Sequence, residues 1–468
     1  PTIKNKTVCV HNGIITNIDQ LWKDYSHFGR EYEIDTEIIC DFFNNVDFND
    51  KTYKNVLHEV FEKIYGETTF GIMPDGYENL LFATNSGSSY YIVDKNDEAI
   101  VISSERFILE KYLDEFYSDD SRFDIVQVEP GEVLVIDELT GEFEHSSMIE
   151  TTALRVKANI EYTVTVNSKL YKRKHTRELT KHNDSEKELL QYDVEKLKEL
   201  KRCTKCLLPE TFPFIEYDDD GVCNYCHNHQ KIEYKPKEEL EKIFKGKQSS
   251  PDSKFLLTFS GGRDSCYGMH LLKEMGKEMI SYSYDWGMIT DLARRNQSRM
   301  CGALGVEHII VSADLEKKRA NVSKNVKAWL KRPSLGIVPL FMAGDKHYFY
   351  YANKVAKDNR LDDLIVLCDN PYEVTYFKFG FAGAKPNFVK KGQLFSISVF
   401  DNLKMLGFYA KEFMLNPRLI NRSMIDTAKG YLSYYGINHD YINLFQYFEW
   451  NEEEIEKILF NNYDWELA

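Results

Sequence analysis

A six-residue loop in the second half of the chain has the residue types that bind phosphate. It consists of Ser260, Gly261, Gly262, Arg263, Asp264 and Ser265. Two adjacent glycines let the backbone turn tightly and bring its N–H groups against phosphate oxygens. The helix expected after the loop presents its positive N-terminal end to the same anion, the serine hydroxyls add donors, and the aspartate can cap the helix or help to place Mg²⁺. The alternative interpretation is an ordinary turn of small residues between a strand and a helix.

Four cysteines form a second group with a chemical pattern. They are Cys203, Cys206, Cys223 and Cys226. Two Cys-x-x-Cys pairs at this separation supply four thiolates for tetrahedral Zn²⁺, and a closed site of this kind has a structural role. Two redox pairs or an iron–sulfur cluster are the alternatives. His227 and His229 lie beside the last cysteine; either could replace a ligand, but we expect them on the surface or behind the ligands.

The elements around the phosphate loop alternate between strand and helix. Apolar runs predict strands at 255–259, 279–284, 308–311 and 364–368, and periodicity predicts helices at 264–275 and 291–304. This alternation implies an α/β domain with a doubly wound parallel sheet. Because ligands of such sheets lie at the carboxyl ends of the strands, Asp285 and Trp286 are candidate nucleotide contacts, as are the residues 369–371. A packed aromatic at 286 and a plain turn at 369–371 are the alternatives.

The first 150 residues have a different pattern. Short β-type runs occur at 8–10, 80–83, 90–93, 99–102 and 133–136, with helices expected at 36–43 and 55–65. We therefore expect an α+β domain with antiparallel sheets at 1–150. A charged linker follows at 151–200 and ends in a helix that Ser185 and Glu188 would cap, with a basic substrate-binding patch as the alternative. The cysteine module then occupies 201–232 and the α/β domain 233–468.

Composition restricts the class of protein. A chain of 468 residues suggests about three domains. The net charge of −15 argues against a nucleic-acid wrapper and against binding to an anionic membrane surface. No apolar run reaches the roughly 18 residues of a membrane span, and the start has no secretion signal. The nine cysteines, five of them scattered, indicate a cytoplasmic enzyme with reduced thiols.

The strand, loop and helix at 255–275 together resemble the PP-loop ATP pyrophosphatases, which have the adenine nucleotide alpha hydrolase-like fold. The loop differs from the Walker pattern because no Gly-Lys-Ser/Thr follows the glycines. The resemblance implies cofactors ATP and Mg²⁺, cleavage of ATP to AMP and pyrophosphate, and adenylylation of an acceptor oxygen before a nucleophile displaces AMP. It also implies that the two serines, the two glycines and Asp264 hold the pyrophosphate.

The stretches 202–211 and 217–223 give a second resemblance. Together with the phosphate loop they are similar to the N-acetyl sugar amidotransferases, and the similarity extends loosely to residue 468. These enzymes convert an acetamido group on a bacterial surface sugar into an acetamidino group, as in lipopolysaccharide biosynthesis. The resemblance implies a zinc ribbon and a sugar or sugar-nucleotide acceptor.

Residues 8–17 and the later Asp35-Thr36-Glu37 resemble the class II glutaminase domain of glucosamine-6-phosphate synthase and asparagine synthetase. The resemblance implies an Ntn-type αββα domain that takes ammonia from glutamine. Asn12 and Gly13 would then stabilise the tetrahedral intermediate, and Asp35 would bind the glutamine α-amino group. For Asn12-Gly13 alone, a hairpin turn is the alternative.

The chain departs from the glutaminase pattern at its nucleophile. That family uses an N-terminal cysteine, whereas this chain starts at Pro1. Cys9 is expected inside a strand and Cys40 in the core of a helix, so neither fits the role. We expect an upstream segment that carries the nucleophile, and an inactive domain kept as a scaffold is the alternative. The end at 465–468 is equally abrupt, so we expect further acceptor contacts beyond it.

The sequence therefore predicts a glutamine- and ATP-dependent amidotransferase in which ammonia passes internally and displaces AMP. A PP-loop enzyme of tRNA thiolation, an asparagine-synthetase-like amide ligase and a catalytically silent assembly partner are the rivals. The isolated positions of Cys266, Cys301 and Cys368 disfavour thiolation, and the intact phosphate loop disfavours a silent partner. We expect no membrane or nucleic-acid partner. If the chain associates with itself, we expect a homodimer.

Overall fold

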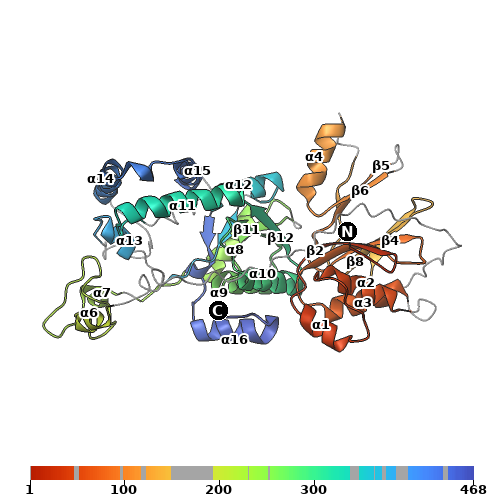
Figure 1. Ribbon diagram of the computed structural model, residues 1–468, viewed down its shortest axis with the longest axis horizontal. Coiled ribbons are helices and arrows are strands. Elements are labelled where there is room, and N and C mark those ends of the chain that lie inside the picture. Colours follow the sequence, from red (N-terminus) through yellow and green to blue (C-terminus); the bar gives the residue numbers. More distant parts are fainter. Residues whose placement is uncertain are drawn as a thin grey trace.

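The structure is a computed structural model of the chain. It describes residues 2–46, 52–94, 99–117, 123–148, 193–229, 231–250, 253–337, 347–362, 364–371, 376–385, 399–435 and 441–467. Figure 1 places the N-terminal domain at one end of the molecule, the cysteine module at the other, and the parallel-sheet domain between them. The capping box expected at Ser185 and Glu188 lies outside the described residues.

The N-terminal domain is built on two antiparallel sheets. The larger has the order β1 (Thr2–Lys4), β2 (Thr7–Gly13), β3 (Thr68–Met73), β4 (Asn79–Thr84), β8 (Glu132–Asp137) and β9 (Phe143–Ser147). The smaller has the order β6 (Ala99–Ser103), β5 (Tyr90–Asp94) and β7 (Val126–Gln127). Four helices accompany them: α1 (Ile18–Asp24), α2 (Thr36–Asn44), α3 (Tyr53–Lys63) and α4 (Arg106–Phe116).

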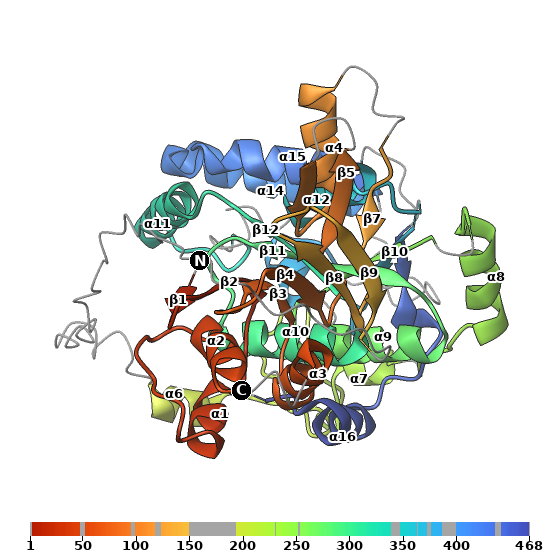
Figure 2. The same ribbon diagram turned by 90° about the vertical axis from the view of Figure 1, so that its right-hand side faces the viewer.

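Alternation along the strands sorts these elements into four layers. In β4, Leu81 and Ala83 pack against α1–α3, whereas Phe82 faces the smaller sheet. In β5, Tyr91 faces the larger sheet and Ile92 packs against α4. Since successive side chains of a strand point to opposite faces, the order is helix, sheet, sheet, helix. This is the αββα order that the resemblance to the glutaminase domains implies, and Figure 2 shows α4 and α1–α3 on opposite sides of the strands. The antiparallel α+β prediction is confirmed.

The C-terminal domain contains a parallel sheet, as predicted. Its order is β12 (Glu307–Ser312), β11 (Met279–Asp285), β10 (Phe255–Thr258), β13 (Ile365–Leu367) and β14 (Tyr441–Asn443). One face is covered by α8 (Lys237–Lys247), α9 (Arg263–Glu274), α10 (Asp291–Leu304) and α16 (Glu452–Tyr463), and the other by α12 (His347–Asp358). The sheet is therefore doubly wound, and the loop at 260–265 lies at the carboxyl end of its middle strand.

The remaining elements flank this sheet. A helical layer contains α11 (Leu315–Lys331), α13 (Tyr376–Phe381), α14 (Val399–Leu415), η3 (Pro417–Leu419) and α15 (Ser423–Tyr435), and η4 (Leu444–Gln446) follows β14. Helix α6 (Val194–Glu199) lies at the end of the predicted linker, and α7 (Asn224–His227) lies in the cysteine module. Helix α6 begins after Asp193, whose carboxylate accepts a hydrogen bond from the Lys196 N–H at 3.2 Å. Within the described ranges, no helix has both the length and the apolar character needed to cross a bilayer.

Candidate functional site

The phosphate loop enters a space where only a glycine fits. Gly261 has a φ of +78°, and a Cβ atom there would lie 2.4 Å from the carbonyl oxygen of Ala293 in α10. Gly262 is extended and forms the N-cap of α9. The main chain of the loop therefore passes directly against α10 before the next helix begins, which places the N-terminal end of α9 at the loop, as the sequence predicted.

The two serines of the loop hold its shape. Their Oγ atoms lie 3.0 Å apart, the Ser260 N–H donates to Ser265 Oγ at 3.2 Å, and Ser265 Oγ donates to the Gly262 carbonyl at 3.1 Å. The Gly262 N–H donates to Ser260 Oγ at 3.3 Å. The hydroxyls thus lie together at the turn, where the sequence places them as phosphate donors.

Helix α16 and the residues before it cover the charged side chains of the loop. Trp450 Nε1 donates to Asp264 Oδ1 at 2.8 Å, and burial raises the pKa of this carboxyl despite that bond and the nearby Arg263. The Arg263 guanidinium pairs with Glu456 at 2.8 Å and also with Glu452. Arg263 belongs to the six-residue loop that the sequence predicts to bind ATP, but its side chain is directed to α16.

A C-terminal segment adds contacts that sequence reasoning missed. Trp465 Nε1 donates to the Gly261 carbonyl at 3.4 Å. The Glu466 carboxylate lies 2.6 Å from Arg295 and 2.6 Å from Arg299, both in α10. These residues follow the loop by some 200 positions, and a single tryptophan has no sequence signal that would link it to a phosphate site.

The two candidates after β11 have different positions. Asp285 is buried, accepts a hydrogen bond from the Gly287 N–H at 2.8 Å and pairs with Arg294 of α10. Its carboxylate therefore fixes the turn after the strand. Trp286 is half-buried and lines a hollow against α11. At the end of β13, the Asp369 carbonyl accepts a hydrogen bond from Asn443 Nδ2 at 3.0 Å.

The structure brings together the three residues compared with the glutaminase domains. Asn12 and Gly13 lie at the end of β2 and pair with Thr69 and Thr68 of β3, so the hairpin alternative is wrong. Gly13 has a φ of +136°, and a Cβ there would lie 2.0 Å from the Glu67 carbonyl oxygen. Asp35 accepts a hydrogen bond from the Ile15 N–H at 3.0 Å, which places its carboxylate beside this segment.

Asp35 has the charge state that an amine-binding residue needs. Burial acts to raise the pKa of its carboxyl, but hydrogen bonds from His11 and from the Ile15 N–H hold the pKa below its usual value. Cys9 and Cys40 are fully buried, and a hydrogen bond between them together with burial raises the pKa of the Cys9 thiol. Neither thiol is placed to act as a nucleophile, as expected.

A row of buried polar side chains lies across the contact between the two domains. Glu67, whose main chain touches Gly13, places its carboxylate 3.9 Å from His308 Nδ1 on β12. His308 Nε2 is 2.8 Å from Ser283 Oγ, which accepts a hydrogen bond from Gln297 Nε2 at 2.9 Å. The Gln297 side chain is one of the groups that crowd Gly261. Buried polar side chains therefore lie in a row between the end of β2 and the phosphate loop.

Burial sets the charge states along this contact. It raises the pKa of Glu67 to about 7 and that of Glu307, a partner of Tyr90 across the interface, to about 8. Burial, with a contribution from the nearby Arg294, lowers the pKa of His308 to about 3. The imidazole is therefore neutral at pH 7, and its contact with Glu67 is not a charged ion pair.

Helix α10 makes several further contacts with the N-terminal domain. Ser298 Oγ donates to the Ile14 carbonyl at 2.8 Å and accepts a hydrogen bond from the Glu67 N–H at 2.7 Å. Arg299 Nε donates to Thr16 Oγ1 at 3.3 Å. Gly302 meets Gly66 without an intervening side chain, since a Cβ at 302 would lie 2.3 Å from the Gly66 carbonyl oxygen.

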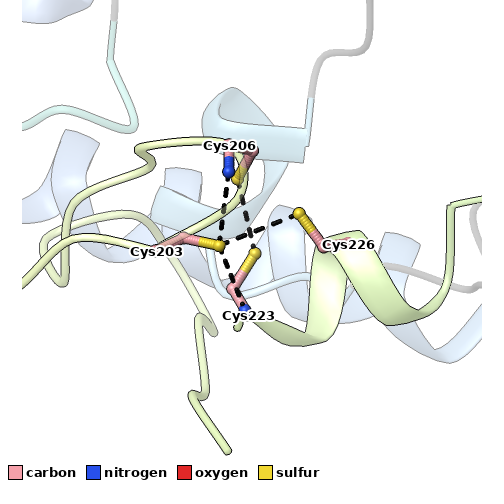
Figure 3. Close-up of side chains that lie close together, drawn as sticks. All are labelled: Cys203, Cys206, Cys223 and Cys226. Carbon is pink, nitrogen blue, oxygen red and sulfur yellow. Dashed lines mark hydrogen bonds between the residues drawn. The ribbon is translucent and has the colours of Figure 1, made fainter. Parts of the chain in front are cut away.

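The four predicted metal ligands converge in the cysteine module (Figure 3). Their sulfur atoms all lie within 4.8 Å of one another, with Cys203 3.8 Å from Cys226 and Cys206 3.6 Å from Cys223. A tetrahedral zinc with bonds of about 2.3 Å places its sulfurs about 3.8 Å apart, so the group fits this ion. The four thiols are unbonded to one another, which excludes disulfide pairs in this state.

Local donors prepare one of these sulfurs for a metal. Burial acts to raise the pKa of the Cys203 thiol, but hydrogen bonds from the N–H groups of Cys206, Lys205 and Cys223 outweigh it and lower the pKa to about 6. His227 Nε2 lies 2.6 Å from Asp218 Oδ2 and not in the sulfur group. The cysteines alone therefore supply the donor set, and His227 has the outer position expected of it.

The chain is similar to known proteins over parts of its length. No family model matches the chain. A glutamine–fructose-6-phosphate aminotransferase (isomerizing) of Bartonella quintana (strain Toulouse) is 25% identical over 162 residues, which are 34% of this chain and 26% of that enzyme. The chain thus spans about a quarter of the length of this curated relative. The match relates the chain to glutamine-using enzymes at the level of sequence.

Two of the similar solved structures each cover less than half of the chain. Glutamine phosphoribosylpyrophosphate amidotransferase of B. subtilis, complexed with ADP and GMP, is 21% identical with a TM-score of 0.24, covering 32% of this chain and 30% of its own. NH3-dependent NAD synthetase of Campylobacter jejuni is 17% identical with a TM-score of 0.22, covering 44% of this chain and 96% of its own.

Proposed function

We propose that the chain is a glutamine- and ATP-dependent amidotransferase. The N-terminal domain would take ammonia from glutamine, and the C-terminal domain would activate an acceptor oxygen with ATP. The acceptor we propose is the N-acetyl group of a bacterial surface-polysaccharide sugar, which would become an acetamidino group. The sequence similarity to a glutamine-using aminotransferase supports the use of glutamine.

The observation that carries the proposal is the loop at Gly261. A strand of a parallel sheet ends in a glycine turn that passes against α10 and leads into the N-terminus of α9. Such a corner presents backbone N–H groups and a positive helix end to an anion. We propose that the β- and γ-phosphates of ATP bind there, with Asp264 as the nearby carboxylate for Mg²⁺, which prefers oxygen ligands.

The proposed reaction has two steps, adenylylation of the acceptor and displacement of AMP by ammonia. The acceptor amide oxygen attacks the α-phosphorus of ATP, and the bond from that phosphorus to the bridging oxygen breaks to release pyrophosphate. Ammonia then adds to the activated carbon, and the C–O bond breaks to release AMP. The nitrogen loses protons to water or buffer, which leaves the amidine. ATP supplies a good leaving group; the chain itself binds and orients the reactants.

The glutaminase half is supported by the group at Asn12, Gly13 and Asp35. The anionic carboxylate of Asp35 lies beside the segment with the proposed oxyanion-hole residues Asn12 and Gly13, and it suits the cationic α-amino group of glutamine. The buried contact between Glu67 and His308 lies between this segment and the phosphate loop. Transfer of ammonia along a buried route would keep it from being protonated by water.

The experiment combines the full-length protein, ATP and glutamine with candidate sugar nucleotides and nonulosonic acids. We expect AMP, pyrophosphate and a product in which NH replaces one oxygen, detected by mass spectrometry. Ammonium chloride in place of glutamine separates the two halves: activity with ammonium alone would limit the proposal to the C-terminal domain. AMP without the mass change removes the amidination step, and transfer of sulfur to tRNA would establish the rival function. Burial of Cys266 and Cys301 argues against that rival.

A further inference from the structure

A trough along α11 is a second feature of the C-terminal domain that the phosphate loop does not explain. One hollow, of about 440 Å³, lies between Trp286 and the α11 residues Arg319 and Lys327. A second, of about 600 Å³, lies between Lys324 and Arg418. Both are lined by Lys327 and Leu330, so they adjoin, and we call them together the α11 trough. Each has the volume of a small-molecule site.

The trough is cationic in a strongly acidic protein. Its charged residues are Arg319, Lys324, Lys327, Lys331 and Arg418. Among the described residues no carboxylate lines either hollow. Lys317 and Lys318 on the same helix are paired with Asp314 and Asp426, whereas the five trough cations have no such partner in the described part of the chain. Uncompensated like charges around a hollow favour an anionic ligand.

The trough also has apolar lining residues. Trp286 is half-buried, and Met288 and Leu330 are 52% and 61% exposed. An indole ring presents an apolar face, which suits the C–H face of a sugar ring. Lysine and arginine side chains bind phosphate or carboxylate oxygens with charge-assisted hydrogen bonds. The ligand that matches both parts has a sugar ring and an anionic group attached to it.

The position of the trough connects it with the phosphate loop. Trp286 directly follows Asp285, the last residue of β11, and β11 is the parallel neighbour of β10, which leads into the loop. The turn that follows β11 is fixed by the hydrogen bond from the Gly287 N–H to the Asp285 carboxylate. The Trp286 end of the trough therefore lies at the carboxyl edge of the sheet, where a second substrate can meet a nucleotide.

We infer that the α11 trough binds the acceptor and that this acceptor is an anionic sugar, carrying a phosphate or a carboxylate. The inference rests on the proposed function and names the substrate class of that site. The sugar ring lies against Trp286, and its anionic group lies among Arg319 and Lys327. A folded RNA is the less favoured ligand because the hollows are small and the whole chain carries a charge of −15.

The test is a binding titration of the full chain by calorimetry, with a non-hydrolysable ATP analogue at saturation so that the nucleotide site is closed to the probes. The probes are UDP-N-acetylglucosamine, which is a phosphate ester, N-acetylneuraminic acid, which is a carboxylate, and neutral N-acetylglucosamine. We expect at least one anionic probe to bind and the neutral sugar to bind at least tenfold more weakly. Equal binding of the neutral sugar, or no anionic binding up to about 1 mM, overturns the inference.

Charge-reversal variants locate the site. The double variant Arg319→Glu/Lys327→Glu is expected to weaken anionic-sugar binding at least tenfold. The matched double variant Lys242→Glu/Lys245→Glu makes the same charge change on exposed lysines of α8, outside the trough, and its affinity should stay within twofold. Equal affinities of the two variants would contradict the site. Tighter binding of bulk tRNA than of either sugar, lost in the trough variant, would reassign the trough to RNA.

Nucleotide binding separates this inference from the proposed function. The trough variant should retain the ATP analogue with wild-type affinity, because its changes lie outside the phosphate loop. If the wild-type chain forms no AMP with any acceptor but binds an anionic sugar in the trough, the proposed reaction fails and the site stands. If AMP forms while the trough variant binds sugar normally, the reaction stands and the site fails.

Discussion

Glycine positions carry the most specific information in this chain. Gly261 and Gly13 both have positive φ, and at each a Cβ atom would collide with main-chain atoms of another segment. No larger residue avoids such a collision, because the obstacle is backbone rather than a flexible side chain. The two residues mark the phosphate loop and the glutaminase-like segment, so both candidate sites depend on close packing of main chain.

Substitution of Gly261 by alanine tests the phosphate loop. A positive φ costs an alanine about 1–2 kcal/mol, and the contact with Ala293 must also be relieved by movement of the loop. We expect Gly261→Ala to lower the affinity for ATP at least tenfold, measured by calorimetry. Gly276 is the matched control, because it has a φ of +65° at the end of α9 with no atom near its Cβ position.

The control variant Gly276→Ala should lose a similar amount of stability from its backbone conformation but keep its affinity for ATP. Thermal unfolding of both variants measures the strain that they share. Equal affinities of the two variants for ATP would mean that the loop at 261 does not bind the nucleotide.

Local signals determined which elements the sequence could predict. Helix α10 was predicted with its observed bounds, because Thr290 caps it through a bond to the Ala293 N–H at 3.1 Å and Gly305 ends it in the left-handed conformation. The helix expected at 55–65 instead spans 53–63, since Thr52 provides its cap. The four-cysteine group was equally local, because all four residues lie within one short module.

Contacts between distant segments account for what the sequence did not predict. β14 has three residues and exists as a strand through its pairing with β13, about 75 residues earlier. The contacts of Trp450 and Trp465 with the phosphate loop, and the turn of Arg263 toward α16, join residues some 190 to 200 positions apart. No periodicity or spacing in a single sequence encodes such pairs. The same holds for the α11 trough.

The cysteine module should depend on its metal. It has little apolar core, so we expect about one zinc per chain by elemental analysis and loss of that zinc in Cys206→Ser, because three sulfurs bind the ion less tightly. His227→Ala should keep the zinc, since His227 pairs with Asp218 outside the sulfur group. Full retention of zinc by Cys206→Ser would contradict the four-cysteine site.

At the level of the whole molecule, the domain contact should weaken as the pH rises. Glu67 and Glu307 have pKa values of about 7 and about 8 in the folded chain, above the ordinary value of 4.5. The folded state therefore holds protons that the unfolded state has released, and this stability is lost as the pH rises through the folded pKa values. His308 acts in the opposite direction, but only below its ordinary pKa of 6.5.

Of the groups at the domain contact, only the carboxyls contribute between pH 6.5 and 8.5, so we expect their contribution to lower the unfolding temperature over this range. The free-energy loss is up to about 1.4 kcal/mol per pH unit for each carboxyl. Glu67→Gln/Glu307→Gln should flatten the dependence, whereas Glu62→Gln, at an exposed position in α3, should not. An identical pH dependence of the double variant and the wild-type chain would refute the assignment.

The close contact between Gly302 and Gly66 allows a second test of the domain contact. A methyl group at 302 would press on the Gly66 carbonyl oxygen, and overpacking of this kind costs about 1–3 kcal/mol. We expect Gly302→Ala to lower the unfolding temperature and to increase proteolysis between the domains. Gly246→Ala is the control: Gly246 lies in α8 with open space around it, so the substitution should be neutral or stabilising. Equal behaviour of the two variants would show that the contact is not tight.

Successive residues of α10 contact four different parts of the chain. Ala293 and Gln297 meet the phosphate loop, Arg294 meets Asp285, Arg295 and Arg299 meet Glu466, and Ser298 and Gly302 meet the N-terminal domain. A helix is stiff about its own axis, so a small roll of α10 displaces all of these contacts in the same movement. A shift of α10 caused by a ligand at one candidate site would therefore also reach the other, which would couple the proposed release of ammonia to the proposed binding of ATP.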